Sequence, residues 1–173
     1  MERWRISRFM NSIKQPNSNH CFVCGRQNLY GLHLEFYENA PGEVTVEYTV
    51  PEQYQGYPGV VHGGVVAAML DEVTGRSQMG GYPPRFMFTA RLNVRYHKNV
   101  PIGKALKIIG KAGISKERTA TASGRIFGPD GDLLAEAEAL LVDVPEDIVH
   151  QVDLEAIGWK VDPDQAGTDG TEK

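Results

Sequence analysis

The sequence lacks the features that mark membrane, secreted and nucleic-acid-binding proteins. Its 173 residues include only two cysteines, too few for a disulfide framework. No apolar run approaches the roughly 18 residues of a membrane-spanning helix, and a net charge of -4 provides no basic field for nucleic acid or anionic lipid. The N-terminal segment lacks the continuous apolar region and cleavage site of a secretory signal. We therefore expect a cytoplasmic protein without a nucleic-acid or membrane partner.

The composition that remains is that of one globular domain. Hydrophobic residues make up 41% and charged residues 23%, and a chain of this length can bury a substantial core. Residues 1–19 predict a lead-in with a short helix, and residues 20–145 predict the domain. Residues 146–173, whose end is polar and rich in glycine, predict a largely disordered extension.

Hydrophobic periodicity predicts about six strands and one helix. The helix is expected at 63–78, where the glycines and prolines of GGYPPR end it. The strands are expected at 31–37, 43–50, 86–100, 104–115, 118–128 and 133–144. An antiparallel sheet has an apolar face that one central helix can cover. The predicted fold class is α+β, with the antiparallel sheet wrapped around one long central helix.

The predicted helix has two faces of different character. The face suited to the sheet is apolar: Val66, Met69, Leu70 and Val73. The opposite face consists mostly of residues with small side chains. Its members are Gly64, Ala67, Ala68, Asp71, Gly75 and Gln78. Glycine costs about 1 kcal/mol relative to alanine in a helix, so this face indicates the close approach of another backbone. In a two-fold dimer that backbone is the same helix of a second copy, and Asp71 then lies at the interface.

The start of the helix is suited to bind a polarised carbonyl. Gly63 and Gly64 leave the first N–H groups unobstructed, and a helix N-terminus carries free donors and partial positive charge. Gly63 and Asp71 are separated by about 12 Å along one helix, so one chain cannot bring both to the same carbonyl. Antiparallel helices of a dimer can do so. Any site built on both residues is therefore shared between subunits.

Three segments resemble one known family. The segment VHGGVVAAMLDEV resembles the central helix of the hotdog-fold thioesterases, in the phenylacetate-pathway (PaaI-like) branch. TARLNVRYHKNVPIG resembles the strand that follows, and CFVCGRQNLYGLHLEF resembles the lead-in of a subset. The resemblance covers about residues 20–144. It implies a hotdog fold and an acyl-CoA thioesterase with no cofactor or metal, working as a homodimer or a dimer of dimers (a homotetramer).

The resemblance also implies roles for residues of the helix. His62, Gly63 and Asp71 match the family's His-Gly-Gly opening and the acid nine positions after the His. The Gly63 N–H would polarise the thioester carbonyl, and Asp71 of the partner subunit would act as nucleophile or general base. His62 either orients substrate or bonds to backbone. Thr89 falls where related enzymes place a Ser or Thr beside the acid. Glu72 is the rival acid, but it lies off the small-residue face.

Other residues are candidates for binding the substrate. The residues expected near the acyl and coenzyme A groups are Gly64, Gln55, Tyr57, Arg91, Arg95, His97 and Arg125. The four basic ones suit phosphates, although a solvated sheet face explains them equally well. Candidates for the acyl pocket are Tyr54, Tyr57, Met79, Phe86 and Phe88. Related enzymes often carry Asn or Gln six residues before the His. Here Gly56 stands in that place, and only Gln53 or Gln55 can replace it.

Three alternatives stay open at this point. The first alternative to a thioesterase is a non-catalytic acyl-thioester binder, which Gly56 favours. The second is a hotdog 3-hydroxyacyl-thioester dehydratase, because a Pro-Gly pair precedes the His. The third alternative concerns Cys21 and Cys24, which suit a tight turn ended by Gly25, a redox dithiol, or half of a zinc site. The nearby candidates for further zinc ligands are His20 and His33.

Overall fold

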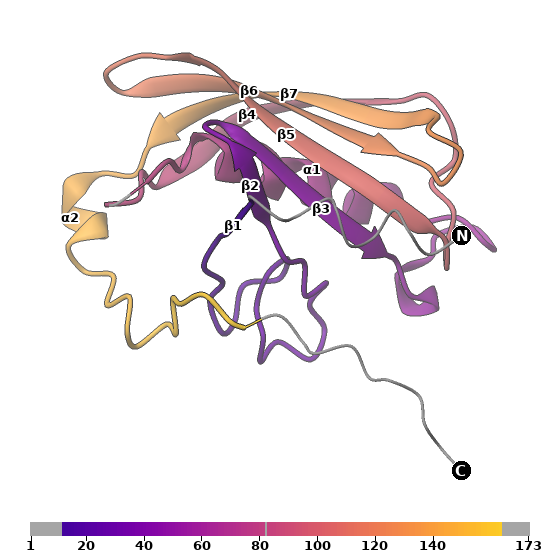
Figure 1. Cartoon of the computed structure of the whole chain (residues 1–173), viewed down its shortest axis with the longest axis horizontal. Helices are drawn as coiled ribbons and strands as arrows, with labels where there is room; N and C mark the ends of the chain where they lie inside the picture. Colours follow the sequence, from indigo (N-terminus) through magenta and orange to yellow (C-terminus); the bar gives the residue numbers. More distant parts are fainter. Residues whose placement is uncertain (1–11, 82, 164–173) are drawn as a thin grey trace.

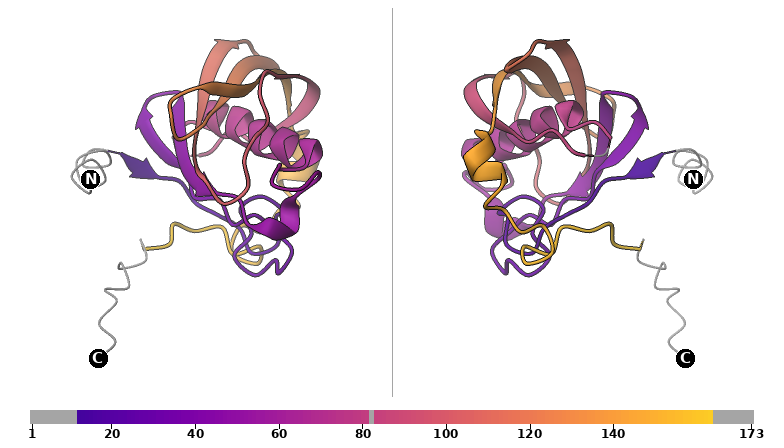
Figure 2. Two further views of the ribbon diagram at one scale, coloured as in Figure 1. Left: turned by 90° about the vertical axis from the view of Figure 1, so that its right-hand side faces the viewer. Right: turned by 90° about the vertical axis from the view of Figure 1, so that its left-hand side faces the viewer.

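A computed structural model of the chain describes residues 12–81 and 83–163. In this part, a seven-stranded antiparallel sheet curves around one long helix (Figures 1 and 2). The strands are, in sheet order, β1 (Ile13–Lys14), β2 (Tyr37–Ala40), β3 (Glu43–Thr49), β5 (Ala105–Ser115), β6 (Thr119–Phe127), β7 (Leu133–Asp143) and β4 (Met87–Tyr96). The helix α1 (Gly63–Gln78) contacts β3 to β7 on the concave face. The predicted architecture is confirmed.

The core lies between α1 and the sheet. The predicted apolar stripe of the helix faces inward, and Val66, Met69, Leu70 and Val73 are at most 1% exposed. Gly110 of β5 permits the close approach, because a Cβ at this position would collide with the Val73 carbonyl. The apolar stripe therefore determines which face of α1 packs on the sheet and leaves the small-residue face on the other side.

The first predicted strand, 31–37, is wrong. Leu32, Leu34 and Phe36 are buried at 2% exposure or less, as the alternation suggested. However, His33 has a positive φ of 57°, which interrupts the extended backbone. The segment pairs instead with the preceding loop, where the Leu32 and Leu34 N–H groups donate to the carbonyls of residues 22 and 23. Strand β2 begins only at Tyr37, and the later strands and the helix form where they were predicted.

The two ends of the described chain pack on the domain. Residues 12–19 contain β1 rather than a helix, and the rest of the predicted lead-in lies outside the described residues. Residues 146–163 are not disordered. They include α2 (Glu146–Val149), and the Trp159 ring meets Phe86 edge-on at 5.5 Å. Residues 164–173 lie outside the described part. None of the described helices is long and apolar enough to cross a membrane.

Arg76 ties both ends of the chain to α1. Its guanidinium is buried and donates to the Glu72 carboxylate at 2.9 Å and to the Pro16 carbonyl at 2.5 Å. It also lies over the rings of Phe36 and Trp159, at 4.4 and 5.2 Å from their centroids. One buried cation therefore holds the N-terminal segment, the helix and the C-terminal extension together.

We expect Arg76→Met to lower the free energy of unfolding by about 2–3 kcal/mol, because the partly buried Glu72 carboxylate and the Pro16 carbonyl then lose their donor. Denaturant unfolding measures the change. Arg118→Met, at an exposed position, is the control and should stay within about 0.5 kcal/mol of wild type. Equal stability of the two variants would contradict this role of Arg76.

Candidate functional site

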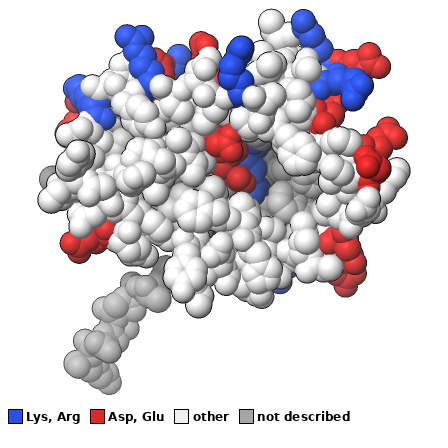
Figure 3. Space-filling model, turned by 180° about the vertical axis from the view of Figure 1, so that it is seen from behind, with Lys and Arg blue, Asp and Glu red and all other residues white. Residues whose placement is uncertain are grey.

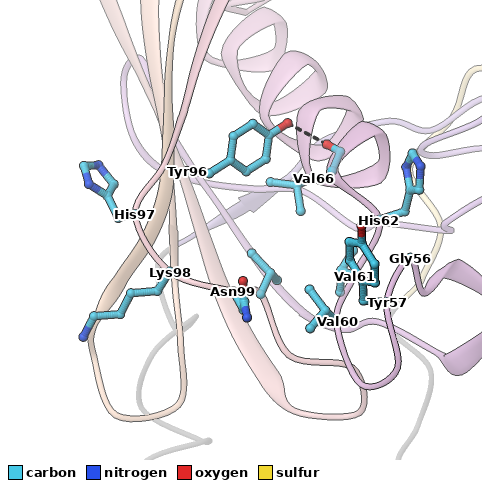
Figure 4. Close-up of a pocket in the computed structure, with 12 residues that line it drawn as sticks. Gly56, Tyr57, Val60, Val61, His62, Val66, Tyr96, His97, Lys98 and Asn99 are labelled. Atoms are coloured by element: carbon cyan, nitrogen blue, oxygen red, sulfur yellow. Dashed lines mark hydrogen bonds between the residues drawn. The ribbon is translucent and has the colours of Figure 1, made fainter.

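The N-terminus of α1 opens onto a pocket. His62 caps the helix, and its Nδ1 accepts the Gly64 N–H at 3.0 Å. The Gly63 N–H has no hydrogen-bond partner among the described residues, while the Gly63 carbonyl accepts the Tyr96 hydroxyl at 2.7 Å. The pocket has a volume of about 630 Å³ and is lined by the 56–63 segment, α1 and the chain after β4 (Figure 4). A free donor therefore lies at the wall of a cavity large enough for a small ligand.

The loop before α1 supplies part of the pocket wall. Gly56, Tyr57 and His62 line the cavity, and Tyr57 is 83% exposed. A Cβ at Gly56 would lie 3.2 Å from the His62 Cα, so residue 56 is next to the helix start and provides no polar side chain there. Gln55 does not line the cavity, and its side-chain oxygen accepts the Gly59 N–H at 3.2 Å. Position 56, where related enzymes often carry Asn or Gln, therefore has no side-chain amide in this chain.

Asp71 and Thr89 meet on the small-residue face of α1. The Thr89 hydroxyl of β4 donates to Asp71 Oδ1 at 2.7 Å. The other carboxylate oxygen has no hydrogen-bond partner among the described residues. A β-bulge at Ala90 makes this contact possible, because the register passes from Thr89 opposite Leu141 to Arg91 opposite Leu140. Thr89 therefore faces the helix and Arg91 faces outward.

The rival acid, Glu72, is engaged elsewhere. Its carboxylate forms an ion pair with Arg76, one turn along the helix, at 2.9 Å. Its second oxygen faces Cys21 Sγ at 4.0 Å. Asp71 is thus the carboxylate of α1 that has a free oxygen beside an exposed threonine.

The basic candidates lie on the outer face of the sheet. Arg95 and Arg125 both lie opposite Glu136 in the register. His97 bonds to Glu136 at 2.9 Å, and Arg125 lies 3.6 Å from it. Hydrogen bonding from His97, together with the Arg125 charge, lowers the pKa of Glu136. Figure 3 shows Lys and Arg along the upper rim of the molecule, over the sheet, and Figure 4 shows His97 and Lys98 pointing away from the pocket.

The apolar candidates separate into two groups. Tyr57 lines the pocket, whereas the Tyr54 hydroxyl bonds to the Gly31 carbonyl at 2.6 Å. The others belong to the opposite end of α1: Met79 is buried, Phe86 packs on Trp159, and Phe88 is 50% exposed on β4. Of these candidates, the structure therefore places only Tyr57 at the pocket beside Gly63.

Tyr96 is a pocket residue that the sequence-based prediction missed. It lies opposite the buried Ala135, so its ring faces the helix, and its hydroxyl fixes the first carbonyl of α1. Its place in the alternation of β4 was the signal that could have identified it, because Leu92 and Val94 precede it on the same face.

The Cys21-Cys24 loop packs against the middle of α1. Cys24 is buried at 2% exposure and Cys21 is partly buried. A hydrogen bond from Cys21 and the nearby Arg76 cation lower the pKa of Cys24 to about 6, against the effect of burial. The same hydrogen bond, burial and the Glu72 charge raise the pKa of Cys21. His20 and His33 are not part of this cluster, and His33 bonds to the Asn28 carbonyl at 2.6 Å.

Comparisons with known proteins agree with this geometry. The thioesterase superfamily model matches residues 58–135. The chain is 31% identical to acyl-coenzyme A thioesterase THEM4 of Xenopus laevis over 108 residues, which are 62% of this chain and 48% of the other. The solved structure of protein RHA08564, a thioesterase superfamily protein, is 34% identical with a TM-score of 0.66, covering 72% of this chain and 61% of that one. The Escherichia coli PaaI protein from the phenylacetic acid degradation operon shares the fold at 14% identity, with a TM-score of 0.60 and coverage of 66% and 81%.

A curved antiparallel sheet around one long helix, with an open helix N-terminus and an acid on the small-residue face, defines a hotdog-fold protein. The chain is similar to proteins of the thioesterase superfamily, as the family model over residues 58–135 and the RHA08564 structure show. It spans about half the length of the Xenopus relative.

Proposed function

We propose that this protein hydrolyses acyl-CoA thioesters to a free acid and coenzyme A. The observation that carries the proposal is the Thr89–Asp71 hydrogen bond of 2.7 Å, which holds one carboxylate oxygen and leaves the other free. As general base, that oxygen takes a proton from water while the water oxygen attacks the thioester carbonyl. As nucleophile, it attacks the carbonyl itself and forms a mixed anhydride with the acyl group, which water then hydrolyses to the free acid and the Asp71 carboxylate. In both cases the C–S bond breaks and coenzyme A leaves as the thiol after protonation.

In this proposal the site is shared between two subunits. The free Gly63 N–H and Asp71 are separated by about 12 Å within one chain, which is too far to act on one carbonyl. An antiparallel pair of α1 helices brings Gly63 of one chain to Asp71 of the partner subunit. The Gly63 N–H then stabilises the oxyanion, and the carboxylate approaches the carbonyl from the other side.

Two features of the chain support a homodimer of this kind. Strand β4 ends the sheet, so its outer edge has no neighbouring strand in the described part. Gly75, one turn after Asp71, lies beside open space, because a Cβ at this position would have nothing within 4 Å. This glycine costs helix stability, and no contact within the chain requires it. A second copy packed on this face accounts for both features.

The proposal includes contacts to coenzyme A at the outer rim. Arg91 and Arg95 are exposed and have no ion-pair partner among the described residues. Their guanidinium groups are therefore available for phosphate oxygens. Arg125 and His97 already bind Glu136, so we expect them to contribute less.

The first experiment measures thiol release from a panel of acyl-CoA esters with short, long and aromatic acyl groups. Turnover with release of one thiol per ester cleaved supports the proposal. Formation of a 2-enoyl ester without thiol release would identify a dehydratase instead. Tight binding of the esters without turnover would identify an acyl-thioester binder.

We expect Gly75→Leu to fold as an isolated chain but to lose dimerisation. The space around Gly75 accepts a side chain within the monomer, whereas a partner helix on this face would clash with leucine. Sizing by light scattering should show a monomer, and the hydrolysis rate should fall with it. Thr119→Leu, on β6 away from this face, provides a matched bulky control. A dimer that persists in Gly75→Leu would exclude this face as the interface.

A further inference from the structure

A second cluster of reactive side chains lies away from the pocket at the helix start. Cys21, Cys24 and Glu72 have their sulfur and carboxylate oxygen atoms within 4.8 Å of one another. Cys24 is buried, and the other two are partly buried. We propose that these three side chains bind a zinc ion, which joins the 21–25 loop to the middle of α1. This inference does not depend on the proposed hydrolysis.

The separations within the cluster are close to those of a zinc site. Zinc binds thiolate sulfur at about 2.3 Å and carboxylate oxygen at about 2.0 Å, so tetrahedral ligand atoms lie about 3.5–3.8 Å apart. Cys21 Sγ already lies 4.0 Å from Glu72 Oε2. Side-chain movements of less than about 1 Å therefore bring the three ligand atoms to zinc-binding distances. A tetrahedral ion keeps its fourth position for water or a small ligand.

The backbone of the loop is arranged around the Cys21 sulfur. The N–H groups of Val23 and Cys24 donate to Cys21 Sγ at 3.3 and 3.4 Å. The Gly25 N–H donates to the Cys21 carbonyl at 2.9 Å, and a Cβ at Gly25 would collide with that carbonyl. Glycine at position 25 therefore permits the tight turn that directs both sulfurs to the same side. Donors directed at a thiolate disperse its charge, as the outer partners of metal ligands do.

Arg76 orients the carboxylate of the cluster. Glu72 Oε1 accepts from Arg76 Nε at 2.9 Å, which leaves Oε2 facing the sulfurs. Ligating carboxylates usually have such a hydrogen-bond partner. Two thiolates and one carboxylate carry three negative charges, and the guanidinium offsets one of them. A divalent cation therefore brings the cluster to neutrality, and the two sulfur ligands favour zinc over the oxygen-preferring magnesium or calcium.

The test measures metal binding directly on the purified full chain. Metal-free protein is titrated with zinc against a chromophoric chelator, and with cobalt to detect the thiolate-to-cobalt charge-transfer absorption. We expect one ion per chain and a thiolate band in wild type. Cys24→Ser should lose the band, and Glu72→Gln should weaken zinc binding by about tenfold or more. Glu117→Gln, in the exposed β5–β6 turn, is the matched control and should bind as wild type does.

Further readouts keep the test decisive if Cys24→Ser does not fold. In wild type, zinc should protect both thiols from alkylation and raise the melting temperature, and Glu72→Gln should reduce both effects. Binding that is equal in wild type, Cys24→Ser and Glu72→Gln would overturn the proposal. Freshly purified protein without free thiols, lighter by two hydrogens, would also overturn it, because the pair would then be a disulfide.

Discussion

Asp71→Asn lowers kcat/KM for acyl-CoA hydrolysis by about 10³-fold, the size expected for the loss of a general base or nucleophile. Asparagine has nearly the shape of aspartate, and its amide oxygen can still accept the Thr89 hydroxyl. The substitution therefore removes the ionised carboxylate and leaves the hydrogen bond and the helix in place. Steady-state thiol release measures the effect.

Two controls make the loss at Asp71 interpretable. Glu117→Gln changes a carboxylate to an amide on the exposed β5–β6 turn and should keep the wild-type rate. Sizing of Asp71→Asn should show the same assembly as wild type. A rate within a few-fold of wild type in Asp71→Asn would remove this residue from the chemistry and would direct attention to Glu72.

Gly63→Pro lowers kcat by about 10²–10³-fold, because it removes one backbone donor of the oxyanion. Proline is well tolerated at the first position of a helix, where its missing N–H has no intrahelical partner. Its neighbour His62 has φ -58 and ψ 134, which suits a residue before proline. The nearest atom to a Cβ at position 63 is the Tyr96 hydroxyl at 3.6 Å, so a Cβ at this position has room.

Gly63→Ala is the matched control for this donor. Alanine adds the same Cβ but keeps the N–H, so it should retain most of the wild-type rate. Circular dichroism should show the same helix content in both variants. If Gly63→Ala and Gly63→Pro lose activity equally, the effect comes from the added carbon, and the Gly63 N–H has no part in catalysis.

Much of the fold could be predicted because local pattern and tertiary structure agree. The helix has one apolar stripe and is ended by glycine and proline, so its bounds and buried face follow from periodicity. Residues 31–37 show where this reasoning fails. Their alternation is that of a strand, but they bury the same side chains against an irregular loop. Alternation reports which side chains are buried and does not identify the backbone partner.

The site was harder to predict than the fold. The pairing of Asp71 with Thr89 matches the expectation, but the bulge at Ala90 that directs Thr89 inward and Arg91 outward has no signature in the sequence. The packing of residues 146–163 was missed for a similar reason. Their anchor is the buried guanidinium of Arg76, and the short apolar stretches of this segment give no local sign of a partner on a distant helix.

The central claim is that each site combines Gly63 of one chain with Asp71 of the partner subunit. The most direct test mixes Gly63→Pro and Asp71→Asn chains, unfolds them together and refolds them. Every mixed dimer then contains one site with both groups intact. Random pairing predicts recovery of about one quarter of the wild-type rate, although each variant alone is nearly inactive. A mixture no more active than the separate variants would contradict the shared site.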